Sequence, residues 1–201
     1  MKVTTEKKII QGQKGFSLPE LIIVLLVIAI LVVFALPQMI ASRRAFSFSG
    51  MKRQVATTLN AARQEAMSQR SLIIVHYNNT DKRIVVHGGK FGALGDARNL
   101  TTELAGGGLE AGDMVYGRPA GATTAALADT SNLTPLVADA VSITFQPDGS
   151  VVDAADHPQN NALFLYNRLY PNEMAFAISV LGAGGRVKIW RYNHATNSYV
   201  E

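Results

Sequence analysis

The N-terminal part of the chain divides into a short polar stretch and a long apolar run. From Phe16 to Leu36 there are 21 residues, and the few that are not strongly apolar lie at its front. A helix rises about 1.5 Å per residue, so this run spans about 30 Å, the thickness of a bilayer core. We therefore predict a membrane-spanning helix over 16–36, preceded by a polar leader over 1–15.

Glu20 is the exception within this apolar run. A carboxylate in an apolar helix costs about 3 kcal/mol on insertion scales, so its presence calls for a cationic partner. If the chain is cut between Gly15 and Phe16, the new α-amine of Phe16 supplies that partner, in the same chain or in a neighbour.

After the apolar run, the pattern becomes that of an amphipathic helix over 37–70. Apolar side chains recur every three or four residues, at Met51, Val55, Leu59, Ala62 and Ala66. This spacing places them on one face of a helix. The ring of Pro37 removes one backbone hydrogen bond, and we expect it to kink the helix rather than end it.

From residue 71 onward, β-branched and aromatic residues gather in short runs that are typical of β-strands, and the apolar positions alternate strictly at 141–145 and 174–180. We expect strands at 71–77, 83–87, 114–116, 141–145, 151–152, 162–166, 174–180 and 186–192, with 174–180 buried on one face only. The sequence thus predicts an α+β protein, in which a long N-terminal helix packs on an antiparallel β-sheet head over 71–201.

The 88–140 segment has a different composition from the rest of the head. It holds ten of the seventeen glycines of the chain and shows little periodicity outside 114–116. Loops of this length are uncommon in compact domains. We expect an exposed, loop-rich excursion from the sheet that buries little and is the part most sensitive to proteases.

Charge is distributed unevenly along the chain. Residues 38–70 contain six basic residues and one acidic residue, a net charge of +5, whereas 71–201 contain nine basic and twelve acidic residues, a net charge of −3. Nucleic-acid binding by the whole head is therefore not indicated. The chain has no cysteine, which excludes disulfides and thiolate metal sites.

The stretch Gly15-Phe16-Ser17-Leu18-Pro19-Glu20 resembles the processing site of type IV pilins and type II secretion pseudopilins. The resemblance implies that a prepilin peptidase cuts between Gly15 and Phe16 and that the amine of Phe16 is then N-methylated. It also implies that Glu20 and Pro37 belong to the helix through which such subunits assemble with other pilins or pseudopilins. An uncleaved signal anchor is the alternative.

The resemblance further implies a location. The chain would be held in the bacterial inner membrane by a single span, with its N-terminus in the cytoplasm and its head in the periplasm, before it enters a pilus or pseudopilus. The basic leader, which contains Lys7, Lys8 and Lys14, agrees with a cytoplasmic N-terminus.

The C-terminal half is similar to the GspH/FimT branch of pseudopilins and minor pilins. The similarity lies in Phe145-Gln146-Pro147-Asp148-Gly149, in the glycine at 182 and in the strand that begins Gly185-Arg186-Val187-Lys188. It implies a minor structural subunit, and the sequence does not decide between a secretion pseudopilus and a pilus.

A second hypothesis concerns the last long strand. Arg186, Lys188 and Arg191 occur there with Trp190, and bases together with an aromatic ring are what a strand of DNA requires. Some FimT-like minor pilins bind DNA through a similar motif, so DNA is the alternative partner. The competing interpretation is a solvated edge strand whose charges prevent edge-to-edge aggregation.

Known catalytic motifs are absent from the sequence, and we expect neither an enzyme nor a bound metal or cofactor. Asp148, Asp153 and Asp156 lie close enough together to suggest a calcium loop, but the EF-hand spacing is missing. We interpret them as solvated acids in a turn.

Overall fold

The structure is a computed structural model that describes residues 15–105, 109–153 and 155–201. The expected leader, apart from Gly15, lies outside the described residues. The described part of the chain divides into two compact units, the first ending at residue 41 and the second covering residues 42–201.

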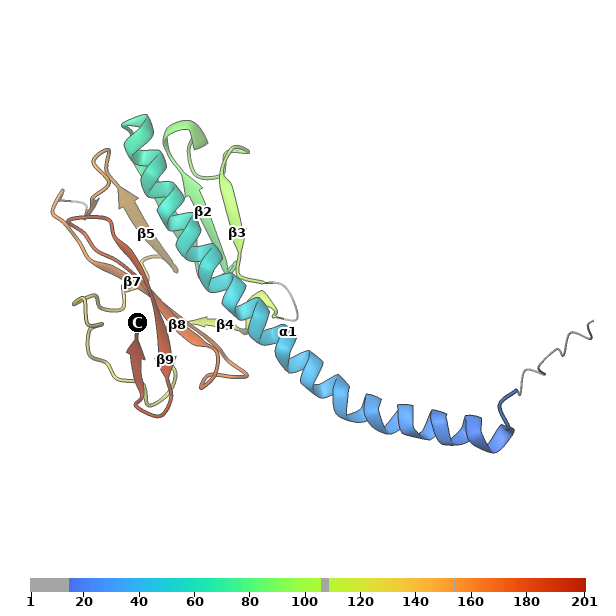
Figure 1. The fold of residues 1–201 in the computed structure, drawn as a ribbon. Helices are drawn as coiled ribbons and strands as arrows, with labels where there is room; N and C mark the ends of the chain where they lie inside the picture. The colour runs from blue at the N-terminus through green and yellow to red at the C-terminus, as the bar shows by residue number, and fades with distance from the viewer. Residues whose placement is uncertain (1–14, 106–108, 154) are drawn as a thin grey trace, which may run out of the picture. The chain divides into compact units, whose positions relative to one another are not determined.

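One long helix, α1, covers Leu18–Gln69 (Figure 1). It continues through Pro37 and through Gly50, so neither residue ends it. In the first unit, every residue from 15 to 41 is exposed. In the second unit, α1 buries Met51, Val55, Leu59, Ala62 and Ala66, as their spacing predicts.

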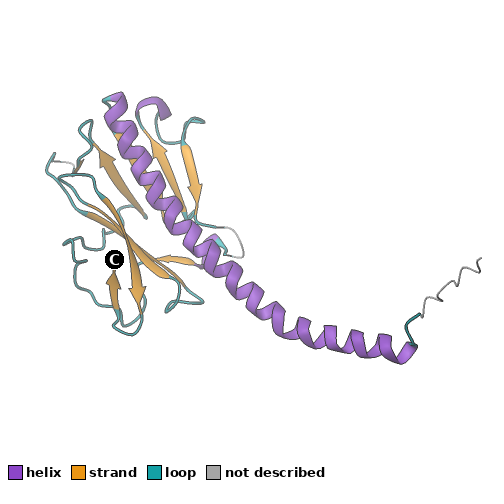
Figure 2. Ribbon diagram, viewed as in Figure 1, coloured by secondary structure: helices purple, strands orange, loops and turns teal. Residues whose placement is uncertain are grey.

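The strands of the second unit form two antiparallel sheets (Figure 2). The first sheet has the order β3 (Leu100–Glu103), β2 (Arg83–His87), β1 (Ile73–Asn78), β5 (Ala140–Phe145) and β6 (Val151–Val152). The second has the order β10 (Ser198–Val200), β9 (Val187–Asn193), β8 (Ala175–Val180), β7 (Asn161–Asn167) and β4 (Met114–Tyr116). Two short 3-10 helices, η1 (Gly89–Phe91) and η2 (Ala111–Asp113), complete the elements. The α+β class is confirmed, with the strands divided between two sheets.

The main core lies between the C-terminal half of α1 and both sheets. Leu59 from the helix, Phe145 from β5 and Phe176 from β8 are fully buried there. The Phe48 ring meets the Phe176 ring edge-on, with centroids 5.4 Å apart. Such contacts from one helix to both sheets hold the second unit together.

A second, smaller core lies on the other face of the second sheet. It contains Leu127, Phe164, Ala177 and Trp190. All six residues of β8 are buried, so the expectation that 174–180 buries one face only is wrong. The reason is that part of the 88–140 segment covers the face that we expected to meet solvent.

The 88–140 segment is therefore more than an excursion from the sheet. It supplies β3 to the first sheet and β4 to the second. Its backbone also bonds to β7, from Gly117 N to Phe164 O at 2.8 Å and from Thr134 N to Ala162 O at 3.0 Å. Most of its described residues are exposed or half-buried, as expected, but Leu104, Leu109 and Met114 enter the main core and Leu127 enters the smaller one.

A chain of hydrogen bonds connects the 88–140 segment to the second sheet. Trp190 Nε1 donates to Ser179 Oγ at 2.8 Å, and Ser179 Oγ in turn donates to Asp129 Oδ2. Asp129 Oδ1 also accepts from Ser131 N at 3.0 Å. Through these hydrogen bonds, Asp129 connects the 88–140 segment to β8 and β9.

We expect Asp129→Ala to lower the free energy of unfolding by about 1–3 kcal/mol, because it leaves the buried Ser179 hydroxyl without its acceptor. Thermal unfolding measures the change, and limited proteolysis should show earlier cleavage between 117 and 135. Glu173→Ala is the control for a lost carboxylate at an exposed turn. An equal effect of both variants would contradict the role assigned to Asp129.

Position 185, where the second sheet meets the turn after β5, requires a residue without a side chain. Its φ is +57°, and a Cβ placed there would lie 1.9 Å from Gly149 O and 2.8 Å from Arg63 Nε. We expect Gly185→Ala to destabilise the head by about 1–3 kcal/mol through backbone strain, which thermal unfolding measures. Gly184→Ala is the control, because a Cβ there meets no atom within 4 Å.

Candidate functional site

The first candidate site is the apolar surface of α1 in the first unit. Phe16 is 77% exposed and Phe34 is 73% exposed, and none of the apolar side chains around them is covered. Within the described part of the chain, α1 is the one helix that is long and apolar enough to cross a membrane. A surface of this size requires an apolar environment, either lipid or the same helix of other subunits.

The predicted processing residues lie at the start of this surface. Gly15, Phe16 and Ser17 precede the helix, and Glu20 lies in its first turn. The first turn is the place where a helix best tolerates a carboxylate, because its free N–H groups carry partial positive charge. Among the described residues, no basic side chain forms an ion pair with Glu20.

The comparison with known families matches this same segment. Residues 10–36 match the prokaryotic N-terminal methylation motif. The chain is type IV pilin-like. The motif implies processing by a prepilin peptidase and assembly with other pilins, and together with the apolar helix it fits anchoring in the inner membrane.

Among solved structures, the pilin-like chain is similar to the type IV minor pilin FimU of Pseudomonas aeruginosa in two crystal forms. For the first, the TM-score is 0.43 at 15% sequence identity, covering 71% of this chain and 87% of that chain. For the second, the TM-score is 0.40 at 15% identity, covering 70% and 90%. The comparison with curated proteins finds no match.

The second candidate site is the basic strand β9 of the head. Its side chains alternate between the two faces of the sheet, so its charges are divided between them. Trp190 points into the second core, whereas Val187 and Ile189 pack against the main core. Lys188 therefore shares the face of Trp190, and Arg191 lies on the opposite face. Arg186 precedes the strand and is exposed. The charges are not gathered on one surface.

Two of the four residues proposed for DNA are also engaged within the head. Trp190 is 2% exposed, so its ring offers no surface on which a base could stack. Lys188 Nζ lies 2.7 Å from Glu201 Oε1 and 4.9 Å from the centroid of the Trp190 ring. DNA binding stays a prediction, and among these residues it rests on Arg186 and Arg191.

Lys52 and Arg53 of α1 interact electrostatically with Arg191 of β9, a grouping that the sequence did not reveal. We call Lys52, Arg53 and Arg191 the basic cluster. Burial, followed by the charges of Arg191 and Arg53, lowers the pKa of Lys52. Lys52 Nζ also lies 5.1 Å from the centroid of the Phe48 ring. Among the described residues, no carboxylate forms an ion pair with the cluster.

A group of acids lies in the turns on either side of β6. We call Asp148, Asp153 and Asp156 the acidic turn. Hydrogen bonds from the Ser150 side chain and backbone lower the pKa of Asp148, and backbone hydrogen bonds from His157 and Ala155 lower the pKa of Asp153. No group of three potential ligands able to hold a metal ion occurs within residues 15–105, 109–153 and 155–201.

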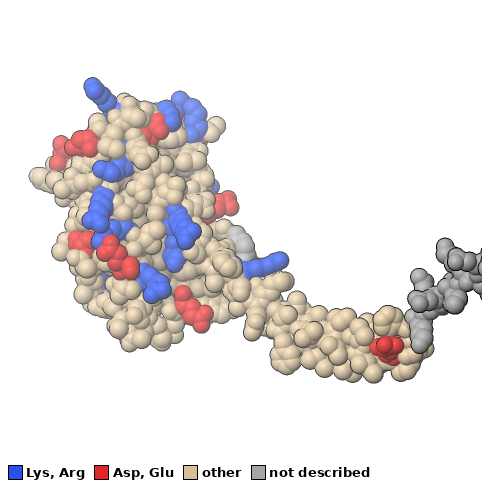
Figure 3. Space-filling model, viewed as in Figure 1, with Lys and Arg blue, Asp and Glu red and all other residues tan. Residues whose placement is uncertain are grey.

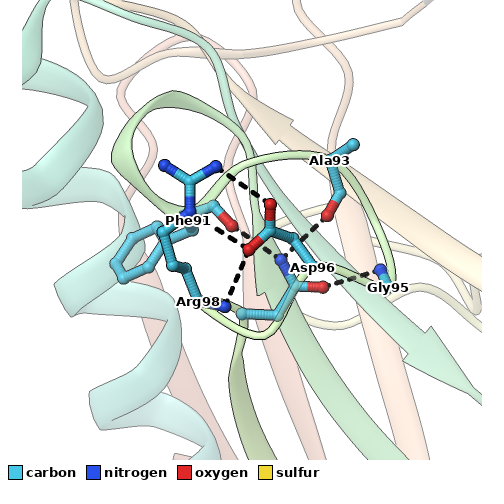
Figure 4. A network of polar contacts seen from close by, with 6 residues as sticks. Phe91, Ala93, Gly95, Asp96 and Arg98 are labelled. Carbon is cyan, nitrogen blue, oxygen red and sulfur yellow. Dashed lines mark hydrogen bonds and ion pairs between the residues drawn. The ribbon is translucent and has the colours of Figure 1, made fainter.

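A further hollow lies on the outer face of the first sheet, beneath the loop from 93 to 99. Its volume is about 440 Å³, and His76, Arg83 and Asp96 contribute to its lining. Figure 4 shows the bonds that fix this loop, among them the pair of Asp96 and Arg98. Asn99 Nδ2 donates to Phe91 O at 2.8 Å and to Ala93 O at 3.0 Å. The Arg98 guanidinium lowers the pKa of Asp96 to about 2.

Proposed function

We propose that this chain is a minor structural subunit of a type IV pilus or a type II secretion pseudopilus. The observation that carries the proposal is the uncovered apolar surface of α1, which overlaps the methylation motif and contains one carboxylate, Glu20, in its first turn. The resemblance of the C-terminal half to the GspH/FimT branch supports a minor subunit.

In this proposal, the chain is inserted with its N-terminus in the cytoplasm and its head in the periplasm. A prepilin peptidase cuts after Gly15, and the amine of Phe16 is N-methylated. The chain then leaves the membrane as its apolar helix packs against the helices of other subunits. The lipid environment is thereby exchanged for an apolar protein environment, so the helix never meets water.

Glu20 would give this assembly step its register. In an apolar environment, an unpaired carboxylate and an unpaired amine are each strongly unfavourable, and a contact between them is favourable by comparison. The Glu20 carboxylate of an incoming subunit would meet the Phe16 amine of its neighbour. Only one axial position of the helix satisfies both charges.

The test follows the chain in a host with and without an active prepilin peptidase. With active peptidase, we expect a shortened chain in membranes and in the sheared fibre fraction. Without it, we expect only the full-length chain, and only in membranes. Gly15→Asp should block shortening, and Gly12→Asp, a glycine in the same leader, is the matched control. A full-length chain in fibres, or shortening without the peptidase, would contradict the proposal.

A further inference from the structure

We propose that the turn between β7 and β8, residues 168–171, rests on the lipid bilayer beside the point where α1 leaves it. In this arrangement, Leu169 enters the boundary between headgroups and acyl chains, and Arg43 binds a lipid phosphate. The occupant of this surface is thus a phospholipid. The inference rests on the membrane stage of the proposed function, because it requires α1 to span a bilayer, and it does not depend on the fibre.

The charged residues of α1 indicate the height at which the helix leaves the bilayer. No charged residue occurs between Glu20 and Arg43, and these 22 residues rise about 33 Å as a helix. A bilayer core is about 30 Å thick, so Glu20 and Arg43 lie at its two surfaces. Figure 3 shows this stretch without charge, between an acidic side chain near the start of the helix and basic side chains at its other end.

Arg44 connects this height to the turn. Its Nη1 donates to the Tyr170 hydroxyl, and its guanidinium lies 5.0 Å from the centroid of the Tyr170 ring. Arg44, Leu169 and Tyr170 also line one hollow of about 220 Å³. Arg44 comes two residues after the charge-free stretch, about 3 Å along the helix, a distance that the helix itself sets whatever the orientation of the two units. The turn therefore lies at the level of the headgroups, which occupy about 5–8 Å on each side of the core.

The turn holds Leu169 outward in a fixed conformation. Asn167 Oδ1 accepts hydrogen bonds from Leu169 N at 2.9 Å and from Tyr170 N at 3.1 Å. Arg168 N donates to Asp113 O at 2.8 Å. The Leu169 side chain is thereby left 60% exposed. A single exposed leucine is ordinary on a protein surface, but this one lies on an ordered turn at the level of the headgroups, where lipid can cover it.

The other side chains at this level are those that a membrane interface favours. Tyr170 combines an apolar ring with a polar hydroxyl, as is typical of residues among the headgroups. Phe46, which is 78% exposed, follows Arg43 within one turn of α1. Long basic side chains extend their apolar stems along lipid and keep their charge among the headgroups.

Arg43 is the base that a lipid phosphate can reach. Its side chain is exposed, and within the described residues no carboxylate lies within 4.0 Å of it. By contrast, Arg168 lies 4.0 Å from Asp113, and the hollow that Arg44 lines is also lined by Glu110 and Asp113. The planar guanidinium of arginine matches the oxygens of a phosphate. The contact thus relies on the phosphate that every phospholipid carries rather than on a large net charge.

The natural absence of cysteine lets a fluorescent reporter be placed at a single position. The full-length chain with Leu169→Cys, labelled with a small environment-sensitive fluorophore, is reconstituted into vesicles of phosphatidylethanolamine and phosphatidylglycerol. We expect a blue-shifted emission. We also expect loss of about half of the fluorescence when the vesicles contain lipids with a nitroxide near the headgroup, because an interfacial side chain lies about 5–10 Å into this boundary.

Leu94→Cys is the matched control, because Leu94 is a leucine of similar exposure, 52%, elsewhere in the head. It follows η1, whose Lys90 N donates to Gln69 Oε1 at 2.9 Å. Gln69 is the last residue of α1 and lies about 38 Å along the helix from Arg44. We expect emission typical of water and no quenching there. Phe34→Cys, within the span, should be quenched by nitroxides placed deeper in the acyl chains.

Charge reversal tests the phosphate contact. Arg43→Glu should lower the quenching at position 169 by about twofold, because a carboxylate at the headgroups repels the phosphates. Arg53→Glu is the control and should leave the quenching unchanged, because this exposed base of the same helix lies about 15 Å further along the axis. Thermal unfolding of each variant in detergent establishes that the head is folded.

The outcomes separate this inference from the proposed function. Quenching at position 34 without quenching at 169, or equal quenching at 169 and 94, would overturn the inference and leave the membrane anchor standing. Quenching at 169 that is indifferent to Arg43→Glu would overturn the role of Arg43. A reporter at position 34 that never meets lipid would overturn the anchor and the inference together. A reporter at 169 that lies in water in vesicles and is shielded only in fibres would make the turn a contact between copies, and the inference would be wrong.

Discussion

Glu20→Ala is expected to leave processing after Gly15 intact and to lower incorporation into fibres at least tenfold. The proposed cleavage is at the Gly15–Phe16 bond, and the side chain at 20 is about one helical turn away from it. During assembly, however, the variant leaves the Phe16 amine of a neighbour without its carboxylate. Removing one partner of a buried charge pair costs about 3–5 kcal/mol, more than a tenfold effect requires.

The measurement is the ratio of processed chain in sheared fibres to processed chain in membranes. Glu20→Gln should behave like Glu20→Ala, because the amide keeps the shape of the side chain but loses the charge. Glu103→Ala, at an exposed position in β3, is the control for a lost carboxylate. Normal incorporation of Glu20→Ala would show that the charge pair does not set assembly.

Trp190→Ala is expected to lower the free energy of unfolding of the head by about 3–5 kcal/mol. The ring is buried in the second core, and its Nε1 donates to the equally buried Ser179 hydroxyl. For a head of this size, the melting temperature should fall by about 10 °C. Trp190→Phe should recover part of the loss, because it refills most of the cavity.

The control for this prediction is Arg186→Ala, which removes an exposed side chain and should leave the melting temperature unchanged. The pair of variants also separates the two interpretations of β9. A folded Trp190→Ala head with unchanged stability and weakened DNA binding would show that the ring serves a ligand rather than the core.

The sequence predicted the parts of the fold in which a single periodicity holds over many residues. The spacing of Met51, Val55 and Leu59 identified the buried face of α1 because a helix repeats every 3.6 residues. β5 was predicted because its apolar positions alternate and end at a turn, and β2 and β7 because they are short runs rich in β-branched or aromatic residues. The methylation motif was found because its residues are contiguous.

The missed features depend on contacts between distant segments. β3 consists of Leu100, Thr101, Thr102 and Glu103, which lack an apolar pattern and become a strand through pairing with β2. β10 is three residues long. The strands divide between two sheets, and the second sheet is covered on both faces. Both features depend on where the 88–140 segment lies, and no local sequence pattern specifies its position.

The candidate sites were likewise predicted where their residues are adjacent in sequence and missed where the residues are distant. Gly15, Phe16 and Glu20 were proposed from adjacent residues. The basic cluster was missed because it joins Lys52 and Arg53 of the helix to Arg191, 138 positions later than Arg53 in the numbering. The grouping of Lys188 with Arg191 overlooked the alternation of a strand, which places residues an odd number apart on opposite faces.

The most direct test of the central claim is the intact mass of the chain purified from its native membranes or fibres, with fragmentation of its N-terminus. The account predicts a chain that begins at Phe16 and carries one additional methyl group on its α-amine. A chain that retains Met1 and the leader in cells with an active prepilin peptidase, or one that is cut at any other position, would contradict the account and favour a plain signal anchor.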